Sequence, residues 1–405
     1  MLYTRNMSNK TLVDLDQWLA PHKSTIQARE KYISSKLKTV LSGKTPAEFA
    51  MGFLHFGLHK TDVGWTFREW APNATQIFLV GDFSDWKERK EFALNRGKNG
   101  EWSVNLSENS LRHGQKYKLR VYWSGGDGWR LPSYANYVVQ DENSVDFSAV
   151  VWSPKTPYNW QNNTPPKPKV PLIYEAHVGM SSQEEKVASF SEFTTEVLPR
   201  IKESGYNTIQ LMAIAEHPYY GSFGYHVSNF FAVSSRFGTP DDFKKLVDVA
   251  HGMGLRVIID LVHAHAAKNE VEGLGNFAGD PTQYFKPTNH PEWDSRLFDY
   301  GKPEVLHFLA SNCRWWLDGY HIDGFRFDGV TSMIYHDHGL GKSFTSYDDY
   351  FRDNVDKDAL AYLRLANETI HTVRPDATTI AEEMSGFPGL GASTKDGGLG
   401  FDYRR

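Results

Sequence analysis

From residue 172 onward the sequence alternates short apolar runs with amphipathic segments, and this alternation restricts the fold more than any other feature. The apolar runs are rich in β-branched residues, which is typical of buried strands. We expect strands at five places: residues 172–178, 207–214, 255–262, 324–330 and 378–383. Continuous apolar strands that are joined by helices predict a parallel sheet covered on both faces. Such a sheet is either doubly wound or a (β/α)₈ barrel.

The segments between these runs have the spacing of amphipathic helices. We expect helices at four places: residues 191–205, 241–254, 303–319 and 359–374. Long insertions follow the third and fourth predicted strands. In a barrel, the carboxyl ends of the strands carry the active site, so the insertions point to that end of the sheet.

The sequence before residue 172 does not alternate apolar runs with amphipathic segments in this way. Residues 1–60 predict a helical lead-in, and residues 61–151 contain short aromatic and β-branched runs separated by turn clusters, which predict an antiparallel β-sandwich. Six of the 19 prolines then fall between Pro154 and Pro171. Because proline favours extended chain, residues 152–171 predict a linker. Residues 172–405 form the third part, the α/β domain.

Composition limits the partners and the compartment. The net charge of −5, with both signs interspersed, argues against a nucleic acid or an anionic membrane and favours a neutral, polar substrate. The single cysteine, Cys313, rules out an internal disulfide and indicates a reducing compartment. The first residues lack the apolar run of a signal peptide, and no run is long enough for a membrane span. We expect a soluble, cytosolic protein and a monomer.

Three acidic residues, Asp260, Asp328 and Glu382, end three successive predicted strands. Neighbouring strands lie about 4.8 Å apart, and a retaining glycosidase needs its two carboxyl groups roughly 5 to 5.5 Å apart. Asp328 and Glu382 therefore fit the nucleophile and the general acid/base of such an enzyme. Any one of the three could be a helix cap or an ion-pair partner, but three at one level favour catalysis. Arg326 lies on the same strand face as Asp328, and we expect it to lower the pKa of Asp328.

Histidines and a tyrosine lie near the same strand ends. His263 and His265 have the spacing of a metal-binding pair, or His265 is a neutral imidazole that bonds a sugar hydroxyl while His263 packs in the core. We expect the second arrangement, with no metal and no cofactor. A second pair at 336–338 predicts a solvated loop. Tyr225 follows a glycine-rich turn after the second strand, and it is either a site residue or an ordinary core tyrosine.

These residues carry a resemblance to a known family. DLVHAH, GFRFDG and TIAEE resemble the first three motifs of the α-amylase superfamily, and YEAHVGMSS and GSFGYHVSNFFAVSSRFGTPDDFKKLVD resemble the glycogen and starch branching enzymes of the eukaryotic type. The resemblance implies a TIM-type barrel preceded by a carbohydrate-binding-type sandwich. It implies an α-glucan polysaccharide as substrate: amylose, glycogen or amylopectin. It also implies residue roles, with Asp328 as nucleophile, Glu382 as acid/base, and Tyr225, Asp260, His265 and Arg326 holding the cleaved glucose.

The sequence departs from the family in three places. Ala264 stands where a serine is usual, and Glu383 stands where an aspartate is usual. The largest departure is at the end, because the sequence stops at GLGFDYRR, where the family continues with three more barrel strands and a fourth motif. We therefore expect only about the first five strands of the barrel, and a fragment or truncated gene product.

The residues and the resemblance are compatible with several functions. The first is branching, in which an α-1,4 bond is cleaved by retaining double displacement and the chain is transferred to a 6-hydroxyl. Hydrolysis or debranching would use the same carboxylates. An inactive, truncated glucan-binding fragment is a further alternative, and a metallohydrolase is a distant one.

Overall fold

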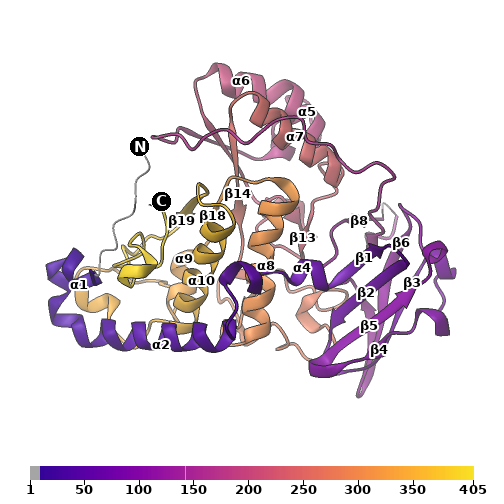
Figure 1. Cartoon of the computed structure of the whole chain (residues 1–405), viewed down its shortest axis with the longest axis horizontal. Helices are drawn as coiled ribbons and strands as arrows, with labels where there is room; N and C mark the ends of the chain where they lie inside the picture. The colour runs from indigo at the N-terminus through magenta and orange to yellow at the C-terminus, as the bar shows by residue number, and fades with distance from the viewer. Residues whose placement is uncertain (1–9, 142) are drawn as a thin grey trace.

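The computed structural model describes residues 10–141 and 143–405. The first nine residues of the predicted helical lead-in 1–60 therefore lie outside the described part of the chain. A β-sandwich lies beside a helix-covered parallel sheet, and the N-terminal helices run beneath that sheet and its helices (Figure 1).

The parallel sheet has six strands in the order β10-β11-β14-β18-β19-β20. Their bounds are β10 (Ile173–Ala176), β11 (Thr208–Leu211), β14 (Arg256–Leu261), β18 (Gly324–Phe327), β19 (Thr378–Ala381) and β20 (Tyr403–Arg404). All five pairings are parallel. Because each strand pairs with the next one along the chain, the order never reverses as it does in a doubly wound sheet. The sheet is therefore part of a barrel, and the five predicted strands are confirmed; β20 was not predicted.

Helices connect these strands as the periodicity predicts. They are α5 (Phe190–Glu192), continued by the π-helical turn η7 (Phe193–Val197) and α6 (Leu198–Glu203), then α7 (Pro240–Gly252), α8 (Pro303–Tyr320) and α10 (Lys357–Val373). Local chemistry sets their ends. Thr239 and Asp242 form a capping box at the start of α7, and His321 ends α8 in the left-handed conformation.

Insertions follow the carboxyl ends of β11, β14 and β18. They contain β12 (Ala215–Glu216), β13 (Asn229–Val233), β15 (His265–Ala266), β16 (Phe285–Asn289), β17 (Arg296–Phe298), α9 (Val330–Ile334) and the 3₁₀ turn η10 (Tyr347–Tyr350). The expectation of long insertions after the third and fourth strands is thus confirmed, and these insertions supply much of the wall around the strand ends.

The β-sandwich consists of two antiparallel sheets, β1-β2-β5-β4 and β3-β6-β9-β8, with β7 paired to β6. Their bounds are β1 (Gly57–Thr61), β2 (Gly64–Trp70), β3 (Ala74–Gly81), β4 (Asn95–Arg96), β5 (Glu101–Leu106), β6 (Lys116–Trp123), β7 (Gly126–Arg130), β8 (Val138–Gln140) and β9 (Phe147–Val150). Alternate residues such as Phe67, Ile77 and Leu119 are fully buried between the sheets, as expected for strands with one face on a core.

The N-terminal helices are α1 (Leu12–Leu15), the 3₁₀ helix η1 (Gln17–His22), α2 (Lys23–Leu41), α3 (Pro46–Phe49) and α4 (Gly52–His55). The longest, α2, runs below α10 in Figure 1 and contacts it. Short 3₁₀ turns occur elsewhere: η2 (Asp82–Ser84), η3 (Lys90–Phe92), η4 (Lys98–Gly100), η5 (Glu108–Ser110), η6 (Val178–Met180), η8 (Tyr220–Ser222), η9 (Leu274–Asn276) and η11 (Thr394–Asp396).

Residues 151–172 form an extended connection without helix or strand. Asp248 of α7 accepts hydrogen bonds from the Tyr158 hydroxyl (2.9 Å) and the Gln161 backbone N–H (2.9 Å). Lys167 donates to the backbone oxygen of Ala377, directly before β19, at 2.7 Å. The connection is therefore fixed along the amino-terminal ends of the parallel strands, opposite to the insertions.

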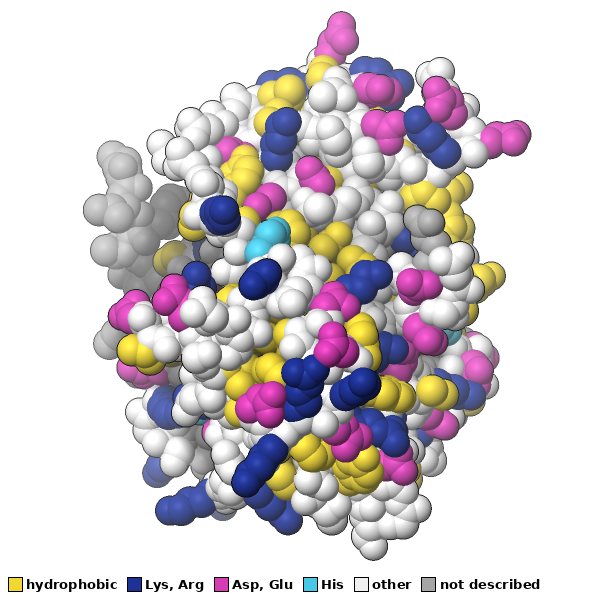
Figure 2. Space-filling view, turned by 90° about the vertical axis from the view of Figure 1, so that its right-hand side faces the viewer, with side chains coloured by type: hydrophobic (Ala, Val, Ile, Leu, Met, Phe, Trp, Pro, Cys, Tyr) yellow, Lys and Arg dark blue, Asp and Glu magenta, His cyan; other side chains and the backbone are white. Residues whose placement is uncertain are grey.

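On the sandwich side of the molecule, basic and acidic side chains are interspersed with apolar ones (Figure 2). Cys313 is buried in α8. None of the helices in the described residues is both long enough and apolar enough to cross a membrane.

Candidate active site

Arg326 of β18 lies at the centre of a cluster of carboxylates. Its Nη1 donates to Asp260 Oδ2 at 2.9 Å and to Asp328 Oδ1 at 2.8 Å. Its Nη2 lies 2.8 Å from Glu382 Oε1. One guanidinium thus bridges the ends of three neighbouring strands, and the structure brings together the three acidic residues and the arginine that the sequence singled out.

The backbone register sets Asp328 beside Glu382. Phe327 pairs with Ala381 in the parallel ladder between β18 and β19, so the residues that follow them leave the sheet at the same level. The Glu382 N–H donates to Phe327 O at 3.0 Å, and the Gly329 N–H donates to Glu382 Oε2 at 2.8 Å. Both carboxyl groups therefore stand at the carboxyl end of the sheet, on neighbouring strands whose backbones lie about 4.8 Å apart.

Tyr225 reaches this cluster from the insertion before β13. Its hydroxyl donates to Asp260 Oδ2 at 2.6 Å. Gly224 makes this position possible, because its φ of +90° is in the left-handed region and a Cβ would lie 1.9 Å from the backbone oxygen of Ala213. The Tyr225 side chain thus lies at the cluster, and its role as a site residue stays a prediction.

The two histidines after β14 do not share a site. His265 Nε2 lies 3.9 Å from Asp328 Oδ2, whereas His263 bonds the Tyr362 hydroxyl through Nδ1 and Asn312 Oδ1 through Nε2 at 2.9 Å. Both nitrogens of His263 are therefore occupied by core partners. In the described part of the chain, no group of three or more His, Cys, Asp or Glu side chains is arranged to hold a metal ion.

Burial is the largest cause of the pKa shifts of the clustered side chains. It raises the pKa of Asp328 to about 7, although the Arg326 guanidinium acts to lower it, and the Glu382 and Asp260 carboxylates raise it further. It also raises the pKa of Asp260 to about 6 and lowers the pKa of His265 to about 3. His265 is therefore neutral at pH 7. Arg326 lowers the pKa of Asp328 as expected, but it does not keep that pKa low, because the loss of solvation outweighs the ion pair.

A cleft with about 1230 Å³ of open space lies over these residues. Asp328, Glu382, Tyr225 and His265 line it, together with His338 and with loop residues that the sequence did not single out: Tyr219, His226, Glu292, Trp293 and Met384. His338 belongs to the pair predicted to lie in a solvated loop. Residues 336–340 do form a turn, with His336 exposed, but His338 is half-buried there and its ring packs 4.5 Å from the His290 ring.

Gln210 of β11 is a further residue that the sequence reasoning missed. Its Nε2 donates to Asp260 Oδ1 at 2.7 Å and to Glu175 Oε1 at 3.3 Å. Because Asp260 also accepts from Tyr225 and Arg326, its two oxygens are held in one orientation. The available signal was a polar residue within the apolar run IQLMAI of the predicted strand. In the structure its side chain is 1% exposed.

Two family models match separate parts of the chain. Residues 55–135 match carbohydrate-binding module 48 (isoamylase N-terminal domain), and residues 193–273 match the alpha amylase catalytic domain. Solved structures support the fold. The pullulanase from Bacillus acidopullulyticus superposes with a TM-score of 0.64 at 20% identity, over 82% of this chain and 42% of that chain. A putative alpha amylase from Salmonella typhimurium superposes with a TM-score of 0.61 at 22% identity, over 81% of this chain and 49% of that chain.

Curated relatives match almost the whole chain. The 1,4-alpha-glucan-branching enzyme of Yarrowia lipolytica is 47% identical over 96% of this chain and 60% of its own length. Those of Equus caballus and Solanum tuberosum are each 46% identical, over 97% and 98% of this chain and 58% and 48% of their own lengths. The chain thus spans about half to three fifths of these proteins. The structure and these similarities lead to one conclusion: the chain belongs to the family of the 1,4-alpha-glucan-branching enzymes.

Proposed function

We propose that this chain carries catalytic residues of a 1,4-alpha-glucan branching reaction, in which an α-1,4 bond is cut and the released segment is joined to a 6-hydroxyl. The observation that carries the proposal is the Arg326 cluster, in which Asp328 and Glu382 stand on neighbouring strands and share one guanidinium. Membership of the branching-enzyme family supports the choice of branching among the reactions that two such carboxylates can perform.

The two carboxyl groups have complementary roles in this mechanism. Asp328 attacks the anomeric carbon and forms a covalent glucosyl-enzyme, while Glu382 gives its proton to the departing 4-oxygen. Glu382 then takes the proton of the incoming 6-hydroxyl, whose oxygen displaces Asp328. The expected separation, about one strand spacing, suits double displacement, since an inverting enzyme needs about 6.5 Å or more between its carboxyl groups.

The remaining residues hold the cleaved glucose in this proposal. Arg326 fixes the orientation of Asp328, and Asp260 is held by Tyr225 and Gln210. His265 is neutral and can donate a hydrogen bond to a sugar hydroxyl. The chemistry needs carboxylates alone, so the proposal includes no cofactor.

The substrate proposed is an α-glucan polysaccharide such as amylose, glycogen or amylopectin, in keeping with the name of the relatives. A monomeric state and a cytosolic location stay predictions from composition.

A branching assay tests the proposal. The purified chain is incubated with amylose, and loss of iodine colour is scored together with new α-1,6 linkages by NMR. We expect branching that is lost in Asp328→Ala and kept in Asp62→Ala, a matched change at an exposed aspartate. New reducing ends without branches would show hydrolysis instead.

A second candidate is glucan binding without turnover, and the match of residues 55–135 to a carbohydrate-binding module favours it. It predicts that the folded chain is retained on immobilised glycogen, that Asp328→Ala is retained equally, and that neither form changes amylose. This outcome would assign catalysis to a longer protein.

A further inference from the structure

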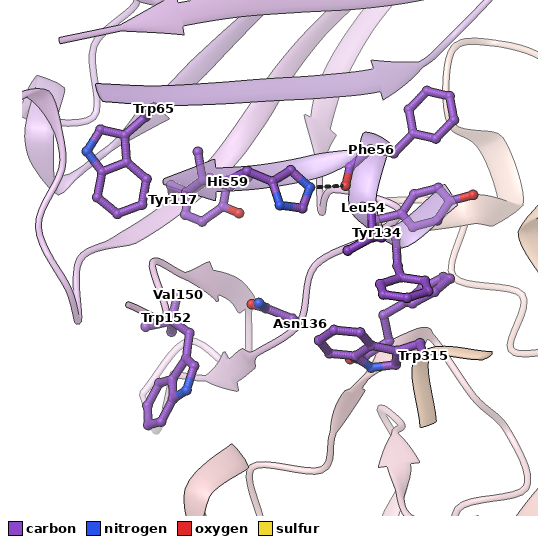
Figure 3. Close-up of a pocket in the computed structure, with 13 residues that line it drawn as sticks. Leu54, Phe56, His59, Trp65, Tyr117, Tyr134, Asn136, Val150, Trp152 and Trp315 are labelled. Carbon is purple, nitrogen blue, oxygen red and sulfur yellow. Dashed lines mark hydrogen bonds between the residues drawn. The ribbon is translucent and has the colours of Figure 1, made fainter. Parts of the chain in front are cut away.

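The orientation of Trp293, on the wall of the catalytic cleft, does not depend on a hydrogen bond of its indole. In the pocket between the sandwich and the barrel domain (Figure 3), by contrast, Trp65 and Trp315 are fixed by their indole N–H groups. These groups donate to backbone carbonyl oxygens at 3.2 and 2.9 Å. The indole N–H of Trp293 makes no hydrogen bond within the described residues. Since Trp293 is only half-buried, its plane needs another support.

That support comes from His290, three residues earlier in the same loop. The two rings are stacked, with their centroids 3.9 Å apart and an angle of 8° between their planes. Residues 290–295 join β16 to β17, and the His290 N–H donates to Ser295 O at 2.9 Å across this loop. The imidazole therefore covers one face of the indole and fixes its plane.

The His290 ring is itself held in place. Its Nδ1 accepts the backbone N–H groups of Glu292 (3.2 Å) and Trp293 (3.1 Å). Burial lowers the pKa of His290 to about 4, so the ring is neutral at pH 7. Because Nδ1 is an acceptor, the proton of the neutral ring is on Nε2. In the part of the chain that the structure describes, this buried Nε2 has no hydrogen-bond partner.

The backbone of the loop does not by itself require an aromatic ring at position 290. The side-chain oxygen of an asparagine commonly accepts the N–H groups of the residues that follow it in a turn, so it could take the place of Nδ1. The histidine instead brings a buried Nε2–H that is left unpaired, which costs free energy. What the ring adds is its face, and that face lies on Trp293.

The supported indole borders the proposed nucleophile. Gly329 follows Asp328, and a Cβ at Gly329 would lie 3.3 Å from Cη2 of Trp293. The centroid of the His265 ring is 4.9 Å from that of the indole, and its Nε2 is 3.9 Å from Asp328 Oδ2. A sugar ring that meets Asp328 therefore comes next to the indole, which offers an apolar surface for C–H groups and an unpaired N–H for a hydroxyl.

We propose that His290 is a positioning residue of the cleft, which holds the Trp293 indole in one plane so that the indole contacts the sugar bound beside Asp328. The identity of that sugar, a unit of an α-glucan, rests on the proposed function. The support of Trp293 by His290 rests on the loop alone.

Two variants separate the ring of His290 from its acceptor atom. His290→Asn keeps an acceptor for the loop N–H groups and removes the ring, whereas His290→Phe keeps a ring and removes the acceptor. Thermal unfolding of both variants shows that they are folded at the temperature of the measurement. If His290 positions the indole, the phenylalanine rescues what the asparagine loses. A residue that only caps the loop gives the opposite order.

The indole N–H signal of Trp293 in ¹⁵N NMR is the readout, assigned by its loss in Trp293→Phe. In the free 405-residue chain, His290→Asn should shift or broaden this signal, because the ring that fixes the indole plane is gone. Maltotriose is then titrated into chains that carry Asp328→Ala, which prevents turnover. We expect a saturable shift, with a Kd raised roughly two- to tenfold by His290→Asn, the usual worth of one aromatic stack, and within about twofold of the parent in His290→Phe.

His113→Asn is the matched control. His113 lies outside the cleft, its Nδ1 also accepts a backbone N–H, from Ser153 at 3.0 Å, and its ring contacts Trp152. The same substitution there should leave the Trp293 signal and the Kd unchanged.

Three results would overturn the proposal: a Trp293 signal that maltotriose does not move, a Kd that His290→Asn leaves unchanged, or a Kd that His290→Phe raises as far as His290→Asn does. These outcomes are independent of the branching assay. Branching with a static Trp293 signal would remove only this inference. A moving signal without turnover would leave a positioned indole in a cleft that binds sugar and does not catalyse.

Discussion

At the scale of single residues, the Arg326 guanidinium and the loss of solvent shift the pKa of Asp328 in opposite directions. Arg326 and Asp328 are two positions apart on one strand, so their contact follows from strand geometry alone. The pKa of Asp328 depends on how much solvent the insertions exclude. Since those insertions have no regular pattern, their burial of Asp328 could not be derived from the sequence. The lowering effect of Arg326 on the pKa was expected, whereas the larger raising effect of burial was not.

The raised pKa of Asp328 makes a prediction about stability. An unfolded aspartate titrates near pH 3.9, and burial raises the pKa of Asp328 in the folded chain to about 7. Below about pH 4 the Asp328 carboxyl is protonated in both the folded and the unfolded state, so its pKa shift does not change the free energy of unfolding. As the pH rises toward 7 the unfolded state loses the proton first, so the folded state becomes less stable. Asp328→Asn should therefore stabilise the chain by roughly 2–4 kcal/mol at pH 8 and by almost nothing at pH 4, while it removes turnover.

Urea unfolding of both forms at pH 4, 6 and 8 measures this difference. Asp62→Asn, at an exposed position, is the matched control and should change little at any pH. A variant Asp328→Asn that is less stable than the parent chain at pH 8 would show that the ion pair with Arg326, not burial, controls Asp328.

At the scale of elements, strands and helices with an apolar pattern were predicted, and irregular segments were not. β14 and β18 are buried on both sides, so apart from Arg256, Asp260 and Arg326 their residues are apolar or glycine. β20 has only two residues, both exposed, and carries no such pattern. Trp293 and His338 line the cleft from insertions whose course depends on tertiary packing, which a single sequence does not encode as periodicity.

The loop after β19 shows how one buried side chain shapes such a segment. Glu383 is 1% exposed and accepts backbone N–H groups from Ser385 (2.7 Å), Gly386 (2.9 Å) and Phe387 (3.0 Å). The sequence marked Glu383 only as a departure from the family. The structure shows that it organises the loop directly beside Glu382.

Glu383→Gln should therefore destabilise the chain by about 2–4 kcal/mol, because an amide replaces one of the acceptor oxygens with a donor and leaves buried N–H groups unpaired. Thermal unfolding measures this effect. Glu382→Gln is the neighbouring control, and it should remove turnover with a much smaller loss of stability. Equal unfolding temperatures for Glu383→Gln and the parent chain would mean that the loop does not depend on this carboxylate.

At the scale of the whole molecule, the order of the parts was predictable, but their mutual packing was not. The N-terminal segment was expected as a lead-in, yet α2 is tied to the barrel domain. Tyr32 and Lys36 both donate to Asp358 at 2.5 Å. Glu30 forms a two-pronged ion pair with Arg364 of α10, at 2.8 and 2.6 Å. Such contacts join positions more than 300 residues apart, and no local pattern predicts them.

The pair of Glu30 and Arg364 tests whether α2 is an integral part of the folded unit. The Arg364 side chain is only 4% exposed, whereas Glu30 is 39% exposed, so solvent screens part of the interaction. Glu30→Ala leaves a buried guanidinium without its carboxylate and should cost about 1–3 kcal/mol. Arg364→Met removes that charge, so the double variant should be no less stable than Arg364→Met alone, within about 0.5 kcal/mol. Urea unfolding of the four forms gives the coupling energy. Additive losses would mean that the two side chains act independently and that α2 is held to α10 by apolar packing alone.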